Sequence, residues 1–134
     1  MILYMLDTNA CIGLIKNNPP SLRQRLMQLE VSQVAISCIV LYELEYGVCR
    51  SQQVQRNREN LDSFLKYIQI LEWNEEQSNE AALLRCELMQ IGQPIGYYDI
   101  LIAAHARSLK ATLVTHNVGE FGRVKGLLVE DWEK

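Results

Sequence analysis

Five short apolar runs, separated by longer segments of helical character, constrain the fold of this chain more than any other feature of its sequence. The runs lie at residues 2–6, 34–37, 68–71, 112–115 and 127–129. Strands that alternate with helices are typical of a parallel sheet, because each parallel connection must cross over the sheet and a helix supplies that crossover. The pattern therefore predicts an α/β fold with a central, mostly parallel sheet.

The segments between these runs carry apolar residues three and four positions apart, which is the spacing of an amphipathic helix. We expect helices after residue 9 and over residues 20–30, 39–48, 54–68, 74–92 and 98–109. Pro20 suits the first turn of its helix, and Asn74 is a good N-cap for the fifth one. These helices connect all the predicted strands except the last pair.

Length and composition indicate a single domain over residues 1–134, since 49% of the residues are apolar and the chain is too short for two ordinary cores. The net charge of −3 disfavours a general nucleic-acid coat but not a nuclease with a local basic rim. The four cysteines form no C-x-x-C pair, so we expect reduced thiols packed as small hydrophobes. The first apolar run is too short for a signal peptide, and no run approaches the roughly 20 residues of a membrane span. We expect a cytoplasmic protein.

Asp7 ends the first apolar run and is the most informative candidate for a functional residue. In open parallel sheets the ligand crevice lies outside the carboxyl ends of the strands, so an acid at this point can hold a cation or a phosphate. Thr8 and Asn9 follow as N-cap groups for the next helix. A capping role explains Asp7 alone equally well, so the other polar residues must decide.

Three further candidates follow the later runs. Glu43 lies early in the helix after the second run, on its apolar face, where a carboxylate is unfavourable unless something cationic meets it. Asp99 opens an apolar helix after a loop with two glycines and a proline; the helix dipole explains an acid there but not the constrained loop. Asn117 follows the fourth run, where a turn is the simpler interpretation.

All four positions are expected at the same edge of a parallel sheet. Three carboxylates and an amide around one crevice would repel one another unless a hard divalent cation neutralised them. Ligation by oxygen alone favours Mg²⁺ or Mn²⁺ over zinc. Such an ion can activate a bound water and stabilise the charge that develops on a phosphodiester. The site needs no Ser, Cys or His nucleophile for this chemistry.

Five motifs in this order resemble the PIN-domain ribonucleases, and within them the VapC-type toxins of bacterial toxin–antitoxin pairs. They are MLDTN at residues 5–9, LYELEYG at 41–47, PIGYYDILIAAHA at 94–106, VTHNVGEF at 114–121 and VKGLLVEDW at 124–132. Any one of them is a weak signal, whereas their order and spacing across nearly the whole chain are specific. The resemblance implies a three-layer α/β/α PIN-like domain.

The resemblance also implies a function and a set of site residues. It predicts a Mg²⁺-dependent endoribonuclease, with Mn²⁺ able to substitute, in which Asp7, Glu43 and Asp99 bind the metal and Asn117 occupies the fourth site position. It implies a cognate VapB-type antitoxin, a homodimer, and initiator tRNA cut in its anticodon loop. Position 117 is an Asn, whereas many family members have an Asp there, and the missing carboxylate makes binding of a second metal ion less favourable. Tyr97 and Tyr98 replace smaller residues and affect the substrate entrance.

Several alternatives remain open from the sequence. A phosphoacceptor receiver domain would need an acidic pair after its first strand, and a haloacid-dehalogenase-type phosphatase would need an acid where Asn9 stands. A non-catalytic PIN-like module that binds RNA or protein is the stronger alternative, since Asn117 fits a decayed site. His105 is six residues beyond Asp99 and faces another direction, so we interpret it as structural. Tyr97 and Tyr98 could stack an RNA base or pack within their loop.

Overall fold

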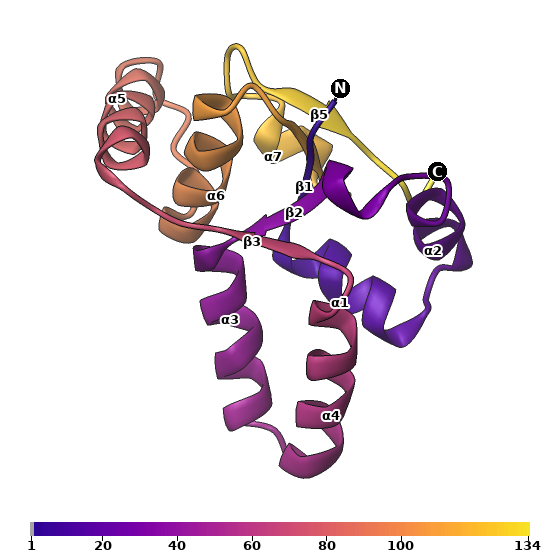
Figure 1. Ribbon diagram of the computed structural model, residues 1–134. Coiled ribbons are helices and arrows are strands. Elements are labelled where there is room, and N and C mark those ends of the chain that lie inside the picture. The colour runs from indigo at the N-terminus through magenta and orange to yellow at the C-terminus, as the bar shows by residue number, and fades with distance from the viewer. Residues whose placement is uncertain (1) are drawn as a thin grey trace.

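Five strands and seven α-helices alternate along residues 2–134, the part of the chain that the computed structural model describes (Figure 1). In chain order they are β1 (Tyr4–Leu6), α1 (Thr8–Lys16), α2 (Pro20–Leu26), the 3-10 helix η1 (Val31–Gln33), β2 (Val34–Ser37), α3 (Cys38–Cys49), α4 (Val54–Leu65), β3 (Gln69–Leu71), α5 (Glu75–Gln90), α6 (Tyr97–Ser108), β4 (Thr112–Val114), α7 (Val118–Phe121) and β5 (Leu128–Glu130). All five predicted strands are present within two residues of their expected positions. The predicted alternation of strand and helix is confirmed.

The strands form one sheet in the order β3-β2-β1-β4-β5, and every neighbouring pair is parallel. β1 lies at the centre, with Tyr4 opposite Val34 on β2 and Thr112 on β4. Helices α5 and α6 lie on one side of the sheet and α1 and α2 on the other (Figure 1). This arrangement confirms the three-layer α/β/α fold.

The sheet reverses its winding between β1 and β4. From β1 the chain moves outward through β2 to β3, and it then returns across the sheet through α5 and α6 to place β4 on the other side of β1. In an open parallel sheet such a reversal leaves a crevice at the carboxyl ends of the two strands. The crevice is therefore expected next to Asp7 and Thr115, which directly follow β1 and β4.

Local sequence sets most helix starts, and two helix ends differ from the prediction. Asn74 caps α5 in a capping box with Gln77, as expected for an Asn three residues before Gln. The predicted helix over residues 20–30 ends at Leu26, because Glu30 and Gln33 form a separate capping box that starts η1. The predicted helix over residues 54–68 ends at Leu65, and the buried Ile68 leads the chain into β3.

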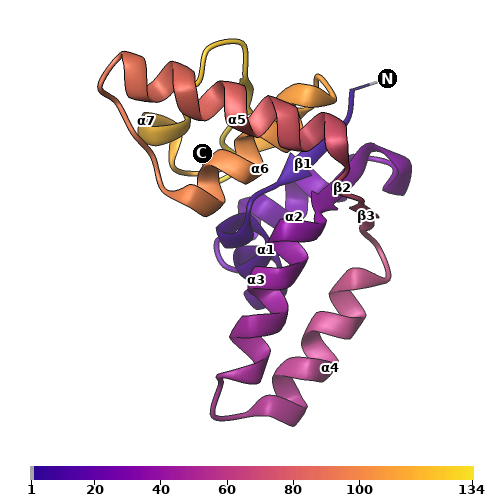
Figure 2. The same ribbon diagram turned by 90° about the vertical axis from the view of Figure 1, so that its left-hand side faces the viewer.

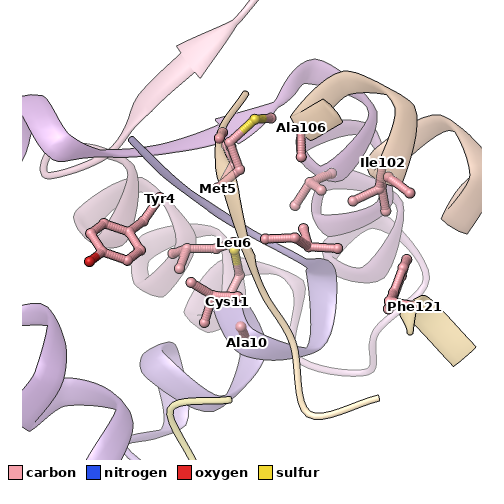
Figure 3. Packing of buried hydrophobic residues seen from close by; sticks show 14 of the residues in the cluster. Tyr4, Met5, Leu6, Ala10, Cys11, Ile102, Ala106 and Phe121 are labelled. Carbon is pink, nitrogen blue, oxygen red and sulfur yellow. The ribbon is translucent and has the colours of Figure 1, made fainter. Parts of the chain in front are cut away.

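The core surrounds β1, whose three residues are all buried (Figure 3). Met5 and Leu6 pack with Cys11 from α1 on one side and with Ile102 from α6 on the other. A strand that is buried on both faces reads as a continuous apolar run, which is why the first run was recognisable. Among residues 2–134, no helix combines the length and the apolar character that crossing a membrane requires.

The cysteines only partly follow the expectation. All four are free thiols, and Cys11 is buried in the core as a small hydrophobe. Cys49 and Cys86 are exposed, contrary to the prediction that the thiols pack inside, because they lie on the outward faces of α3 and α5.

Helices α3 and α4 extend away from the sheet as a two-helix arm (Figures 1 and 2). Arg58 on α4 pairs with Glu45 on α3 and with Asp62 one turn further along α4. Glu45 is therefore tied into the arm and not directed toward the crevice. The start of α3 remains at the sheet edge, where it presents Glu43.

Candidate active site

Asp7 lies at the carboxyl end of the central strand and is almost entirely buried, with 6% of its surface exposed. Its backbone N–H donates to Val114 O of β4 at 3.0 Å, and its side chain caps α1 by accepting from the Ala10 N–H at 2.7 Å. The capping role considered from the sequence is therefore present, and the residue also lies in the crevice, where its role as a metal ligand stays a prediction. Burial raises the pKa of the Asp7 carboxyl, although hydrogen bonds from Thr115 and Ala10 oppose the rise.

Glu43 reaches the same crevice from the first half of α3. The Thr8 hydroxyl, at the start of α1, donates to Glu43 Oε1 at 2.7 Å. Since Thr8 follows Asp7 directly, this bond fixes Glu43 beside the end of β1. Glu43 contributes to the raised pKa values of both Asp7 and Asp99, so the three carboxyls lie near one another.

Asp99 lies in the first turn of α6 and is at the centre of the acidic residues. Helix α6 precedes β4 and runs antiparallel to it, so the start of the helix is at the carboxyl edge of the sheet. The pKa of Asp99 is raised to about 6, first by burial, then by the nearby Glu120 and more weakly by Glu43 and Asp7. A helix N-terminus by itself favours an ionised acid. The pKa of Asp99 shifts the opposite way because burial, reinforced by the neighbouring carboxylates, disfavours its ionised form.

Glu120 is the site residue that the sequence analysis missed. Its carboxylate lies against Asp99, and it accepts hydrogen bonds from the Gly96 N–H at 3.2 Å and from the Asn117 amide. Asn117 itself donates its backbone N–H to Thr115 Oγ1 at 3.0 Å. The Asn117 side-chain amide therefore orients the Glu120 carboxylate. The signal was an acid three residues after Asn117, which is one helical turn along α7.

The acidic cluster, defined as Asp7, Glu43, Asp99 and Glu120, is made of oxygen donors only. Within residues 2–134, no three members of the acidic cluster each place a carboxylate oxygen within 4.8 Å of the others. The donor set fits a hard divalent cation that retains part of its water shell, because Mg²⁺ is commonly held by one or two carboxylates together with waters. The mutual repulsion at Asp99 also favours a bound cation, since a cation would stabilise the ionised carboxylates.

The C-terminal residues also reach this edge of the sheet. His116 Nδ1 lies 3.0 Å from Asp131 Oδ2 and 3.9 Å from Glu133 Oε2. Glu133 contributes to the raised pKa of Asp7, so the end of the chain adds negative charge next to the acidic cluster. His116 thus joins the strand end after β4 to the residues after β5.

His105 belongs to the core. Its Nδ1 is hydrogen-bonded to Ser37 Oγ at 2.7 Å, and its ring meets the Trp73 ring edge-on with centroids 5.5 Å apart. Burial lowers the pKa of His105. The structural interpretation of this residue is confirmed, and Ser37 in turn caps α3 through the Ile39 N–H.

Comparison with known proteins agrees with this geometry. The PIN domain family model matches residues 4–127, which is most of the chain. The chain belongs to the PIN-domain family. A tRNA(fMet)-specific endonuclease VapC of Shigella flexneri is 42% identical over 98% of this chain and 99% of that protein, and the ribonuclease VapC2 of Rickettsia felis is 42% identical over 99% of this chain and 100% of that protein. Within the PIN-domain family, the chain therefore belongs with the VapC ribonuclease toxins.

Solved structures of VapC proteins with their partners have the same fold. VapBC2 of Rickettsia felis, bound to a promoter DNA fragment, contains a chain with a TM-score of 0.92 and 41% identity, covering 98% of this chain and 99% of that one. DNA-bound VapBC of Salmonella typhimurium contains a chain with a TM-score of 0.92 and 39% identity over the same shares. PIN-domain nucleases generally depend on divalent metal ions, in agreement with the all-oxygen character of the acidic cluster.

Proposed function

We propose that the acidic cluster is the active site of a Mg²⁺-dependent endoribonuclease. The observation that carries this assignment is the convergence of Asp7, Glu43, Asp99 and Glu120 at the crevice between β1 and β4, where burial and the acidic neighbours also raise the pKa of Asp99. Asp7, Asp99 and Glu43 hold the metal in this proposal, as the sequence indicated. Glu120 is added to them, and Asn117 becomes the residue that orients Glu120.

A bound Mg²⁺ would lower the pKa of a water and stabilise the charge that develops on the phosphate. The chain's own residues prepare the crevice for this chemistry. Ala10 and Thr115 hold the Asp7 carboxylate in one orientation, and Thr8 holds that of Glu43. Carboxylates fixed in this way need little rearrangement when a cation and a phosphodiester arrive.

The choice of metal can be tested directly. Purified protein should cleave RNA with Mg²⁺ or Mn²⁺ and lose the activity in EDTA, because the carboxylates need a cation to stop repelling one another. Readdition of either ion should restore cleavage. Equal cleavage in EDTA would overturn the metal-dependent mechanism, and a complete lack of cleavage with every divalent ion would favour the non-catalytic binding module.

We propose initiator tRNA as the substrate, cut in its anticodon loop. This proposal rests on the similarity to the tRNA(fMet)-specific endonucleases of Shigella flexneri and Salmonella typhimurium, at 42% and 39% identity. A splayed loop offers both an accessible phosphate and unstacked bases. Sequencing of RNA 5′ ends after induced expression should give cuts in the initiator anticodon loop. Broad cleavage of messenger RNA with intact initiator tRNA would reject this substrate. With such a substrate and partner, the protein acts in the cytoplasm.

We propose a VapB-type antitoxin as the protein partner, since the similar structures from Rickettsia felis and Salmonella typhimurium are VapBC complexes. Its C-terminal segment would lie over the helices and bring an Arg to the acidic cluster, where charge-assisted bonds to carboxylates are strong. Co-expressed antitoxin should therefore abolish cleavage and compete with Mg²⁺. Full cleavage by the purified complex would contradict this occlusion.

We also propose a homodimer that assembles through apolar helix faces. Several large apolar side chains are exposed on the helices, among them Leu83 and Met89 on α5. Light scattering at micromolar concentrations should give the mass of a dimer. A monomer mass over the whole concentration range would reject it.

A further inference from the structure

Two tyrosines, each one residue before an acid of the cluster, meet at the mouth of the crevice. Tyr42 precedes Glu43 on α3, and Tyr98 precedes Asp99 on α6. Their ring centroids are 5.8 Å apart and their hydroxyl oxygens are 3.4 Å apart. Tyr42 and Tyr98 line the same groove as Glu43, so the tyrosine pair lies next to the proposed metal position.

Packing does not explain this pair. Tyr42 and Tyr98 remain 53% and 48% exposed, so each ring leaves about half of its surface in water. The neighbouring Tyr97 differs, since its ring lies under the Arg85 guanidinium of α5, 4.8 Å from the ring centroid. Of the two tyrosines at the start of α6, only Tyr98 therefore turns toward the crevice.

The pair borders a groove of about 570 Å³ that runs between α1, α3 and α4. Thr8 and Glu43 line the groove where it meets the acidic cluster, and Lys16 and Arg50 line it farther away. The Arg50 guanidinium lies 5.6 Å from the centroid of the Tyr46 ring, which also lines the groove. The surface thus changes from acidic to aromatic to basic along its length.

This order of charges matches one strand of RNA. A metal at the acidic end would face the phosphate that is cut, an aromatic surface stacks a base of any sequence, and a guanidinium or ammonium group pairs with another phosphate. We propose that Tyr42 and Tyr98 form a stacking platform for one unstacked base beside the cleaved phosphodiester, with Arg50 contacting a phosphate farther along the strand. The platform rests on the proposed ribonuclease function and specifies how that site selects single-stranded loops.

The test removes each of the two tyrosine rings by substitution with Ala and uses a neighbouring tyrosine as the matched control. In a cleavage-deficient Asp7→Asn background, the Kd for an anticodon stem-loop should rise about 5- to 100-fold in Tyr98→Ala and in Tyr42→Ala, the range expected for loss of one base-stacking contact. Tyr98→Phe should stay close to the parent, because it keeps the ring and loses only the hydroxyl. Tyr97→Ala removes a neighbouring exposed ring that is directed at α5, and it should leave the Kd unchanged.

Cleavage kinetics and fluorescence give two further measurements that would not change if Tyr98 had only a structural role. With Asp7 present, Tyr98→Ala should raise KM with little change in kcat at saturating RNA. A 2-aminopurine placed next to the cleaved phosphate should be quenched on binding to the Asp7→Asn protein, and the Tyr98→Ala change should remove that quenching. Melting curves of each variant report whether the fold is intact.

The outcomes distinguish a failure of the stacking platform from a failure of the proposed ribonuclease function. If Asp7-containing protein cleaves RNA while Tyr98→Ala and Tyr42→Ala bind it with parental Kd, the platform is wrong and the ribonuclease function stands. An equal loss in Tyr97→Ala would also overturn the assignment to this pair. Unchanged RNA binding with weakened binding of the antitoxin would assign the surface to the protein partner. If the parental protein cleaves no RNA with any divalent ion, the proposed function itself fails.

Discussion

Asp7 combines two tasks that usually conflict in one side chain. As an N-cap it stabilises α1 through the Ala10 N–H, and as a buried acid beside other acids it destabilises the metal-free fold when it is ionised. Asn is an equally good N-cap and carries no charge. The substitution Asp7→Asn therefore separates the proposed role in metal binding from the structural role as an N-cap.

We expect Asp7→Asn to lower cleavage at least about 100-fold, because residues that merely support metal ligands already contribute about 10- to 100-fold. The metal-free free energy of unfolding should stay equal or increase, since one negative charge leaves the crevice. Cleavage rates and urea unfolding in EDTA measure the two effects. Glu72→Gln, an exposed acid outside the cluster, serves as the control. Retained cleavage by a well-folded Asp7→Asn protein would contradict the assignment.

Asn117 and Glu120 should respond differently to substitution. Asn117→Ala removes a donor to Glu120, so cleavage should fall about 10- to 100-fold, as expected for a residue that orients a ligand. Glu120→Gln and Asp99→Asn should each cause a larger loss. Asn117→Asp replaces the donor with another carboxylate, and we expect tighter Mn²⁺ binding and greater occupancy of a second metal position. Calorimetric titrations with Mn²⁺ measure both; affinities identical to the parent would place Asn117 outside the metal's surroundings.

At the scale of elements, a buried hydrogen-bonded link joins the helices that carry Glu43 and Asp99. Ser37 ends β2, caps α3 and bonds to His105 on α6. Because the lowered pKa of His105 keeps its ring neutral near pH 7, the link adds no charge to the core. Two helices that are remote in sequence are thus fixed relative to each other beneath the acidic cluster.

Gly13 sets the approach of α1 to α2 and gives a clear prediction. A Cβ at this position would lie 2.4 Å from Leu22 Cδ1 and 3.1 Å from the Asn18 carbonyl oxygen. Leu22 is buried and cannot move aside freely. Gly13→Ala should therefore lower the free energy of unfolding by about 1–3 kcal/mol, as overpacking does.

Gly47 on α3 is the matched control for that experiment. A Cβ at this position would have no atom within 4 Å, so we expect no steric overlap from the added methyl group. Gly47→Ala should raise the free energy of unfolding by roughly 0.5–1 kcal/mol, because Ala loses less backbone entropy in a helix. Chemical denaturation of both variants gives the comparison. Destabilisation by Gly47→Ala would reveal a close contact on α3 that the structure does not contain.

At the scale of the whole molecule, the raised carboxyl pKa values predict how stability depends on pH. A carboxyl with a higher pKa in the folded state than in the unfolded state binds its proton more tightly in the folded state. For Asp99, the associated stability is fully present below the ordinary value of 3.8 and is lost as the pH rises through about 6. Asp7 changes in the same direction.

Metal-free protein should therefore lose stability between about pH 4 and 7 from these groups, and Asp99→Asn should flatten that part of the profile. If Mg²⁺ binds the ionised carboxylates, as proposed, its stabilising effect should be small at pH 5 and large at pH 8. Thermal unfolding with and without Mg²⁺ at several pH values measures both effects. An equal Mg²⁺ shift at pH 5 and pH 8 would show that the cation binds elsewhere.

The sequence by itself determined the strands, most helix starts and three of the four acids that meet in the acidic cluster. Strands buried on both faces read as apolar runs, helix caps such as Asn74 depend on residues a few positions away, and Asp7 marks the end of the central strand. Such signals can be read from the sequence because they depend only on residues that are close together along the chain. The same is true of the alternation that predicted a parallel sheet.

Only the tertiary structure decided which side chains meet. The tertiary structure packed the starts of α6 and α7 at the same edge of the sheet, which brought Glu120 against Asp99, and the order of the strands placed these acids beside Asp7. It also joined Tyr42 to Tyr98 across 56 residues of sequence. Contacts of this kind depend on how helices pack over a sheet, and no local spacing encodes that packing. A raised pKa has the same origin, because it measures the burial and charge that distant segments impose on one carboxyl.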